Sequence, residues 1–119
     1  MIDPDCVFCQ IVVADDGNVI VASGRTWVAF RPLKPVSTRH VLFVPRRHVV
    51  SAVTAPRVAG RVVRAAAEWV RANGPQGNLL TSSGPDATQT VNHLHVHAIL
   101  RGPTFNEGLS KDWPWEGLR

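Results

Sequence analysis

Three histidines, His93, His95 and His97, alternate with the apolar residues Leu94 and Val96 in the last third of the chain. On a β-strand successive side chains point to opposite faces, so the three imidazoles would share one face while the apolar side chains enter the core. One isolated histidine in such a place is most often a structural residue. Three at a period of two indicate nucleophilic or acid–base chemistry near neutral pH, with a hydrogen-bonded, solvent-facing row as the alternative.

A metal ion bound by the triad alone is disfavoured by geometry. His93 and His97 would lie about 13 Å apart along an extended strand, whereas zinc needs each nitrogen at about 2 Å. Cys6 and Cys9 offer another pair of ligands, because two intervening residues suit two thiolates on one zinc ion. A closed structural site needs two more ligands, and His48 and one triad member are the available choices.

The pair Cys6-x-x-Cys9 has two further interpretations. Thiol–disulfide enzymes use the same spacing, but their motif follows a strand, and only five residues precede Cys6 in this chain. Two idle, buried cysteines are the other alternative. A disulfide between residues so close in sequence would close no useful loop, which favours a reducing compartment and therefore the cytoplasm.

Short clusters of glycine and proline divide the chain into the elements that must position these side chains. Hydrophobic patterning and β-propensity predict five strands, at residues 18–22, 26–31, 40–44, 77–81 and 92–100. A helical period predicts one long helix, from a Thr54 N-cap to Asn73-Gly74. Its apolar face is formed by Val58, Val62, Ala66 and Trp69, with arginines opposite. This order predicts an α+β domain with a largely antiparallel sheet.

The composition fits one globular domain that spans residues 1–119. Of its 119 residues 45% are hydrophobic, so it can fold without disulfides. No cationic, apolar leader is visible and no apolar run is long enough to cross a bilayer, so no membrane partner is expected. The net charge of +4 favours anionic partners such as phosphates. Nucleic acid is not expected, because the sequence has no run of aromatic residues for base stacking.

Three motifs occur in the order seen in the histidine triad superfamily: Cys6-x-x-Cys9, the stretch from Arg39 to His48 (RHVLFVPRRH), and Gln89-Thr90-Val91-Asn92 followed by the triad. The resemblance extends to about Gly102 and points to the zinc-bearing histidine triad nucleotide-binding proteins, the branch of nucleoside phosphoramidate hydrolases. It implies a HIT-like fold with a five-stranded sheet, one long helix and a short N-terminal helix. It also implies a homodimer in which the tail, residues 103–119, reaches the neighbouring site.

In that family the middle histidine attacks the α-phosphorus of a nucleotide and forms a nucleotidyl-histidine, which water resolves. Carried over, the nucleophile is His95. His97 would stabilise charge on the phosphoryl oxygens, and the Thr90 hydroxyl would contact the phosphate or the leaving group. The loop at residues 84–88 could present backbone N–H groups to the anion. This chemistry needs no catalytic metal, since histidines and backbone dipoles supply the electrostatics.

The same resemblance assigns a structural zinc ion to four residues: Cys6, Cys9, His48 and His93. His93 would thus anchor the triad through the metal. The other two histidines would stay available to react.

Substrate recognition departs from the family's pattern. Where similar proteins hold the ribose with an acidic residue or asparagine, this chain has Pro32, and Ser82 stands where a longer polar side chain is common. The expected substrate contacts are Gln89, Ser82, Phe30 and Arg31. The base and the leaving group stay open at this point.

The expected activity is hydrolysis of a nucleoside monophosphate joined to an amine. The loop Gly84-Pro85-x-Ala87-x-Gln89-Thr90 resembles the fragile histidine triad branch, which keeps dinucleoside polyphosphate hydrolysis as an alternative. Transfer of the nucleotidyl group to an acceptor, and a catalytically weak nucleotide-binding module, are the others. In the tail, Trp113 and Trp115 would either cap the chain's own core or lie at the partner's site.

Overall fold

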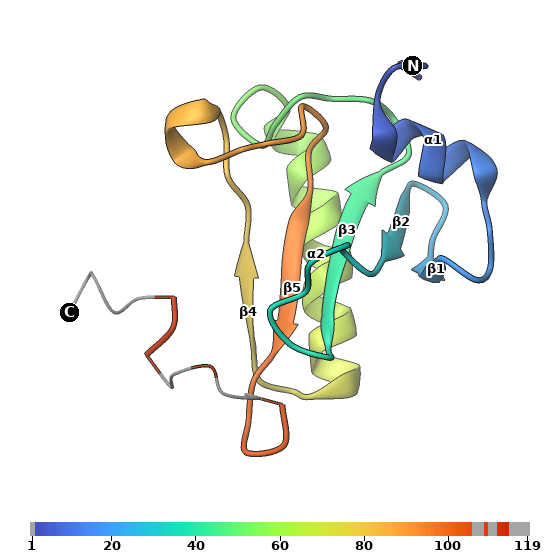
Figure 1. Ribbon diagram of the computed structural model, residues 1–119. Helices are drawn as coiled ribbons and strands as arrows, with labels where there is room; N and C mark the ends of the chain where they lie inside the picture. The colour runs from blue at the N-terminus through green and yellow to red at the C-terminus, as the bar shows by residue number, and fades with distance from the viewer. Residues whose placement is uncertain (1, 106–108, 110–111, 115–119) are drawn as a thin grey trace.

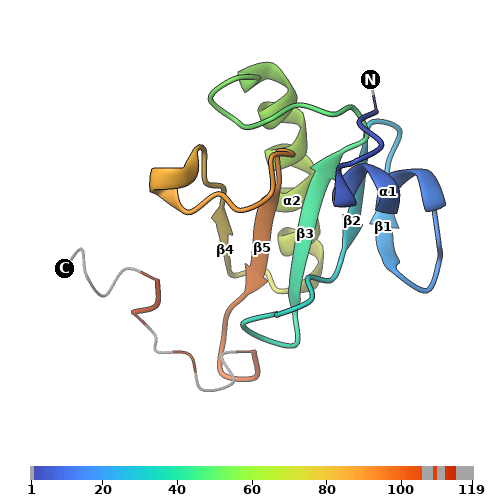
Figure 2. The same ribbon diagram turned by 45° about the horizontal axis from the view of Figure 1, so that its top comes forward.

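The computed structural model describes residues 2–105, 109 and 112–114. A five-stranded sheet with the order β1-β2-β3-β5-β4 carries one α-helix on each face (Figures 1 and 2). Its elements are α1 (Val7–Ala14), β1 (Ile20–Ser23), β2 (Trp27–Phe30), β3 (His40–Pro45), α2 (Pro56–Asn73), β4 (Gly77–Leu80), a 3-10 helix (Pro85–Ala87) and β5 (Val96–Leu100). Every neighbouring pair of strands is antiparallel, which confirms the predicted α+β class.

The long helix α2 covers the part of one face formed by β3, β5 and β4. Its buried side chains recur at helical spacing and meet inward-facing residues of the strands, among them Val41, Phe43, Ala98 and Leu100. Fully burying one large apolar side chain of this kind contributes about 1.5 to 3 kcal/mol. The predicted apolar face is confirmed, because Val62 and Ala66 are buried and Trp69 packs on the same core.

The start of α2 differs from the expectation. The helix begins at Pro56 and its N-cap is Ala55, which makes no side-chain cap bond. Thr54 is therefore not the cap. Its hydroxyl bonds to the Ser51 carbonyl instead, in a turn that precedes the helix, because serine and threonine side chains compete for nearby backbone groups. The end at Asn73 is as predicted.

The short helix α1 covers the opposite face of β1, β2 and β3. Phe8 and Val12 from the helix pack on Val28, Phe30 and Leu42 of the strands. The helix lies over β1 and β2 rather than over β5 (Figure 2), and only its first turn reaches the histidines. The short N-terminal helix implied by the family resemblance is confirmed.

The strand expected at residues 92–100 begins only at Val96. Pairing with β4 ends at Leu80 and His97, and pairing with β3 ends at Phe43 and Val96, so the residues before Val96 have no partner in either ladder. Two other bonds hold them: the Thr81 hydroxyl donates to the His95 carbonyl at 2.8 Å, and Leu94 N–H donates to the Val49 carbonyl at 2.8 Å. The segment is thus extended by side-chain and loop contacts rather than by pairing.

Part of the tail contacts Arg101, the residue that follows β5. Arg101 donates to the Trp113 carbonyl at 2.6 Å and to the Asn78 side chain at 2.8 Å, and its guanidinium lies 5.8 Å from the Trp113 ring. Trp115 lies outside the described residues. No helix in the described part of the chain is long and apolar enough to span a membrane.

Candidate functional site: a thiol–imidazole cluster beside a histidine relay

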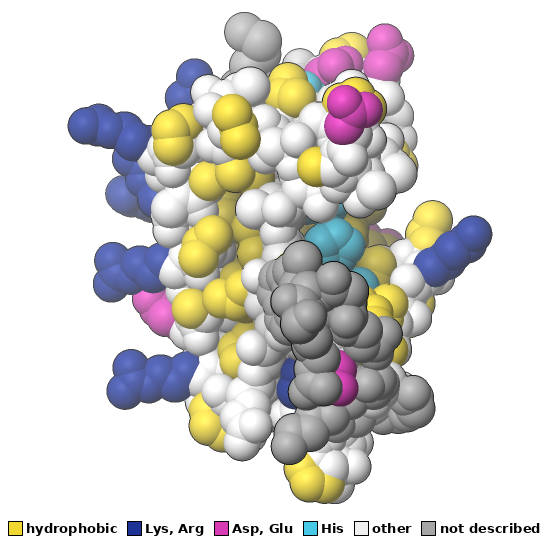
Figure 3. All heavy atoms as spheres, turned by 90° about the vertical axis from the view of Figure 1, so that its left-hand side faces the viewer, with side chains coloured by type: hydrophobic (Ala, Val, Ile, Leu, Met, Phe, Trp, Pro, Cys, Tyr) yellow, Lys and Arg dark blue, Asp and Glu magenta, His cyan; other side chains and the backbone are white. Residues whose placement is uncertain are grey.

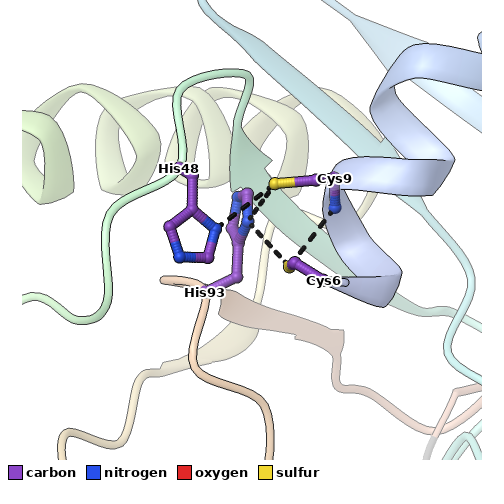
Figure 4. A group of neighbouring side chains, drawn as sticks. All are labelled: Cys6, Cys9, His48 and His93. Atoms are coloured by element: carbon purple, nitrogen blue, oxygen red, sulfur yellow. Dashed lines mark hydrogen bonds between the residues drawn. The ribbon is translucent and has the colours of Figure 1, made fainter. Parts of the chain in front are cut away.

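Two cysteines and two histidines meet where α1, the end of β3 and the approach to β5 converge (Figure 4). Cys6 is the N-cap of α1, and Cys9 follows in its first turn. The Cys6 sulfur lies 3.4 Å from His93 Nδ1, and the Cys9 sulfur lies 3.3 Å from His48 Nδ1 and 3.5 Å from His93 Nδ1. The four potential ligand atoms all lie within 4.8 Å of one another.

These distances suit one tetrahedral zinc ion. With Zn–S near 2.3 Å and Zn–N near 2.0 to 2.1 Å, sulfur and nitrogen ligands lie about 3.6 Å apart. His93 Nε2 bonds to the Pro45 carbonyl at 2.9 Å, so the ring carries its proton there and turns the Nδ1 lone pair toward the sulfurs. Burial lowers the pKa of His93, which keeps the ring neutral as a ligand must be.

The cysteines also point to a cation. Both are free thiols, and Cys9 is fully buried. Burial raises the pKa of the Cys9 thiol, so a thiolate there needs a positive partner. The predicted set Cys6, Cys9, His48 and His93 is thus brought together by three segments of backbone, with a donor set that fits zinc.

His95 is buried and oriented by its own backbone neighbour. Its Nδ1 lies 2.8 Å from the His93 carbonyl, which can only accept. The proton of the neutral ring therefore sits on Nδ1, and Nε2 carries the available lone pair. The edge of Phe8 from α1 packs against the ring at a centroid distance of 5.2 Å. Only 8% of His95 is exposed, so little solvent competes for this lone pair.

His97 is linked to a fourth histidine. The Val36 N–H donates to His40 Nδ1 at 3.1 Å, so neutral His40 carries its proton on Nε2, which donates to His97 Nδ1 at 2.9 Å. His97 then keeps its own proton on Nε2. Burial lowers the pKa of each ring to about 4, with the neighbouring His97 a second cause for His40 and His95 a second cause for His97. Both rings are therefore neutral near pH 7.

His40 is a site residue that sequence reasoning missed. It opens β3, where its Cα pairs with Ile99, and its ring reaches the diagonal neighbour His97 on the same face. Only the pairing of β3 with β5 reveals it, because the register of the two strands brings the His40 ring next to the His97 ring. That register is not visible in either segment alone.

Thr90 and Gln89 take different positions in the loop before the triad. Thr90 is exposed, and among the described residues its hydroxyl and its N–H have no partner. Gln89 is buried: its carboxamide oxygen accepts from Gly84 N–H at 2.8 Å, and its nitrogen donates to the carbonyls of Val50 and Val91. The polar atoms of the Gln89 side chain thus hold the loop together, and its contact with substrate stays a prediction.

The backbone of this loop is also largely bonded. The N–H groups of Ala87, Thr88 and Gln89 all bond within the loop, and that of Gly84 bonds to the Gln89 side chain. These N–H groups are thus bonded within the loop, and anion binding by residues 84–88 stays a prediction. Thr90 is a donor in the described part of the loop that has no such bond.

The remaining expected substrate contacts lie around the open side of the sheet. Phe30 is buried beneath α1, with its ring 5.3 Å from Phe8, and so belongs to the core. Arg31 is exposed in the segment that follows β2, and Ser82 is half-buried just beyond β4. Figure 3 shows that histidine side chains reach the surface on the side of the molecule that carries β4 and β5.

Comparison with known proteins gives consistent results. Residues 14–104 match the HIT domain family. Adenosine 5′-monophosphoramidase hnt1 of Schizosaccharomyces pombe is 31% identical over 111 residues, covering 92% of this chain and 83% of that protein. A histidine triad protein from Clostridium difficile has a TM-score of 0.75 at 27% identity, with 86% and 94% of the two chains covered. A zinc-bound histidine triad family protein from Mycobacterium smegmatis has a TM-score of 0.75 at 25% identity, with 90% and 81% covered.

The fold, the three alternating histidines and the family match over residues 14–104 agree with one another. The relatives named above include a hydrolase of a nucleoside phosphoramidate, a substrate type that a nucleophilic imidazole can attack. The chain therefore belongs to the HIT domain family of histidine triad proteins.

Proposed function

We propose that this protein hydrolyses the phosphorus–nitrogen bond of a nucleoside phosphoramidate through a covalent intermediate on His95. The observation that carries the proposal is the pair of ring tautomers. His95 holds its proton on Nδ1 and offers a lone pair on Nε2, while the adjacent His97 offers an N–H on its own Nε2. A nucleophile and a hydrogen-bond donor are thus placed side by side, with ring centroids 5.3 Å apart.

The proposed reaction has two displacements. His95 Nε2 attacks the α-phosphorus, and the bond to the nitrogen breaks as the neutral amine leaves with a proton taken from solvent, which the attacking water of the second step later returns. Attack places positive charge on the His95 ring, which the bond from Nδ1–H to the His93 carbonyl stabilises. Water then attacks phosphorus, the bond to Nε2 breaks, and its electron pair returns to the ring as the nucleoside monophosphate leaves.

Charge on the phosphoryl oxygens would be met by two neutral donors. His97 Nε2–H is one, held in place by the His40 bond to its other nitrogen. The Thr90 hydroxyl, which has no partner among the described residues, is the other. A preorganised donor such as His97 commonly accounts for a factor of about 10² to 10³ in rate. The exposed Thr90 hydroxyl would contribute one neutral hydrogen bond, which is worth less. Arg31 and Ser82 are proposed to contact the rest of the substrate.

The zinc ion is proposed as a structural cofactor on Cys6, Cys9, His48 and His93, with no part in the bond-breaking step. A four-ligand site leaves no open position for substrate. The protein is further proposed to be a cytoplasmic homodimer: the two free thiols suit a reducing compartment. Subunit pairing would bring the tail of one chain near the site of the other.

The test is a substrate panel followed by adduct trapping. Purified protein is incubated with adenosine 5′-phosphoramidate, other nucleoside phosphoramidates and diadenosine polyphosphates, then quenched and examined by peptide mass spectrometry. The proposal predicts fastest turnover on a phosphoramidate and an acid-labile nucleotidyl adduct on His95. Faster turnover of a dinucleoside polyphosphate would favour the alternative hydrolase, and an adduct on another residue would overturn the assignment of the nucleophile.

A further inference from the structure

A groove of about 760 Å³ lies between α2 and the β1–β2 turn, on the face of the sheet opposite the histidines. Its apolar surface is formed by Trp27 and Trp69, and its rim by Arg25, Arg61 and Arg64. We call it the Trp–Arg groove. Nothing in the proposed hydrolysis uses any of these residues.

The groove exists because α2 does not cover the whole sheet. The helix packs on β3, β5 and β4, while Ala22 of β1 and Ala29 of β2, which are paired, present only methyl groups on that side. Trp27 lies 5.2 Å from Phe43, and Phe43 lies 6.0 Å from Trp69, measured between ring centroids. Both indoles, Trp27 at the start of β2 and Trp69 on α2, are only partly buried, so solvent reaches part of each ring. The Arg39 guanidinium lies 5.7 Å from the Trp69 ring centroid.

Positive charge is concentrated around these rings. A smaller hollow of about 140 Å³ shares Thr26 and Arg61 with the groove and adds Arg47 to its rim. No acceptor among the described residues bonds to the guanidinium groups of Arg25, Arg47 or Arg61. Glu68 is the one acidic residue on the lining, and Arg64 already pairs with it at 2.9 Å. Figure 3 shows the row of basic side chains along the side of the molecule that carries α2.

This combination indicates what the groove would bind. Arginine forks match phosphate oxygens, and indole rings offer a flat surface to a planar base. A duplex could reach the arginines, but its paired bases could not reach Trp27 and Trp69. An acidic peptide could satisfy the arginines, yet it would leave the aromatic surface without a planar partner. We propose that the Trp–Arg groove binds single-stranded nucleic acid.

The sequence does not show this site because its two rings lie far apart along the chain, Trp27 in the first strand pair and Trp69 on the long helix. Only the packing of α2 on Phe43 brings them to one groove. The expectation that nucleic acid is not a partner rested on the absence of neighbouring aromatic residues, a criterion that ignores this arrangement.

The test measures binding of a fluorescein-labelled oligouridylate of about ten nucleotides, a length that spans typical single-strand sites, by fluorescence anisotropy at low salt. Arg61→Glu is compared with Arg71→Glu. Both side chains are exposed on α2, but only Arg61 lines the groove. We expect Arg61→Glu to weaken binding about tenfold, since it removes a phosphate contact in the groove. Arg71→Glu should weaken binding only about twofold, since it changes only the general charge of the protein. Tryptophan fluorescence should be quenched on binding, and less so in Trp69→Phe.

Four further results decide the outcome. Turnover of the phosphoramidate should be unchanged in Arg61→Glu, and excess adenosine monophosphate should not displace the oligonucleotide. Displacement would locate the binding at the histidines and overturn the proposal. Equal loss in the two arginine variants, or equal binding of the matching duplex, would reduce it to general charge attraction. Binding of an oligoglutamate peptide in place of the oligouridylate, with the same dependence on Arg61, would identify an acidic protein segment instead.

Discussion

The two ends of the histidine triad differ in their neighbours rather than in their residues. His93 Nδ1 faces two cysteine sulfurs and its Nε2–H is taken by the Pro45 carbonyl. His97 Nδ1 accepts from His40, which leaves its Nε2–H for other use. Burial lowers the pKa of both rings, so both are neutral. The role of each histidine is thus decided by which of its ring nitrogens the neighbouring groups occupy.

The middle of the triad gives the largest expected effect. His95→Ala removes the ring in the middle of the triad that carries the free Nε2 lone pair. We expect turnover to fall by at least about a thousandfold, since no other group supplies the attacking atom. Steady-state kinetics on a phosphoramidate measure this. The zinc content should stay the same, because His95 is not a ligand. If the His95→Ala variant still formed the nucleotidyl adduct, His95 would not be the nucleophile.

The His93 end can be broken at its thiols. Cys9→Ser should lose most of the bound metal and lower the free energy of unfolding by several kcal/mol, in line with other structural zinc sites. Elemental analysis and urea unfolding measure the two effects. The matched control is Val13→Ser, an exposed position on the same helix that lies outside the cluster. Wild-type protein that is fully folded and metal-free without chelator would contradict the assignment.

The His97 end can be tested with two variants of graded effect. His97→Ala removes the Nε2–H donor, and we expect kcat to fall about a hundredfold with KM little changed. His40→Ala removes only the bond that orients His97, so its loss should be smaller, about tenfold. In the double variant the effects should not add, because His40 acts through His97. Simple additivity would mean that His40 acts independently of His97.

The same end makes stability depend on pH. His40 and His97 have pKa values of about 4 in the folded protein, below the value of about 6.5 expected for an unfolded chain. Between these values the unfolded state binds more protons, so stability is complete above about pH 6.5, falls as the pH is lowered toward 4, and levels off below that. Urea unfolding from pH 7 to 4.5 should show a shallower decline for His40→Gln than for wild type. If the free energy of unfolding of the two proteins fell equally steeply with pH, His40 would not contribute to the pH dependence.

Thr90→Ala should have the smallest effect. It removes one neutral hydrogen bond, worth about 0.5 to 1.5 kcal/mol net, so kcat/KM should fall about twofold to twelvefold. Thr88→Ala is the control, because that exposed hydroxyl bonds only to its neighbour's carbonyl in the same loop. A loss as large as that of His97→Ala would mean that Thr90 has a larger share in stabilising the transition state than a single bond allows.

Much of the fold followed from local patterns. The helical period located α2, and the strand patterns located all five strands to within a few residues, because each pattern reports which side chains are buried. The start of β5 could not be predicted. Alternation continues through Leu94 and Val96, although pairing with β3 ends at Val96 and pairing with β4 ends at His97. Whether an extended segment is paired depends on a strand elsewhere in the chain.

The candidate site was predictable to a similar extent. Spacing and the family resemblance gave the four cluster residues, which the fold does bring together. Two assignments needed three-dimensional information. His40 reaches the site through cross-strand register, and the Gln89 side chain is held inside the protein in part by its bond to the Val50 carbonyl, 39 residues away in the sequence. Register and loop closure are long-range properties, so no window of the sequence contains them.

The first turn of α1 has a consequence for the rate at which metal would exchange. Cys6 and Cys9 occupy this turn together with Phe8, whose ring touches both His93 and His95. Two of the four proposed metal ligands therefore lie on the same turn as the ring that packs against the proposed nucleophile. We expect metal release to be slow and cooperative, and we expect the protein to be inactive after each release until α1 has packed against the sheet again. The turnover rate of a sample, followed over time, would then report the fraction of protein that still holds metal.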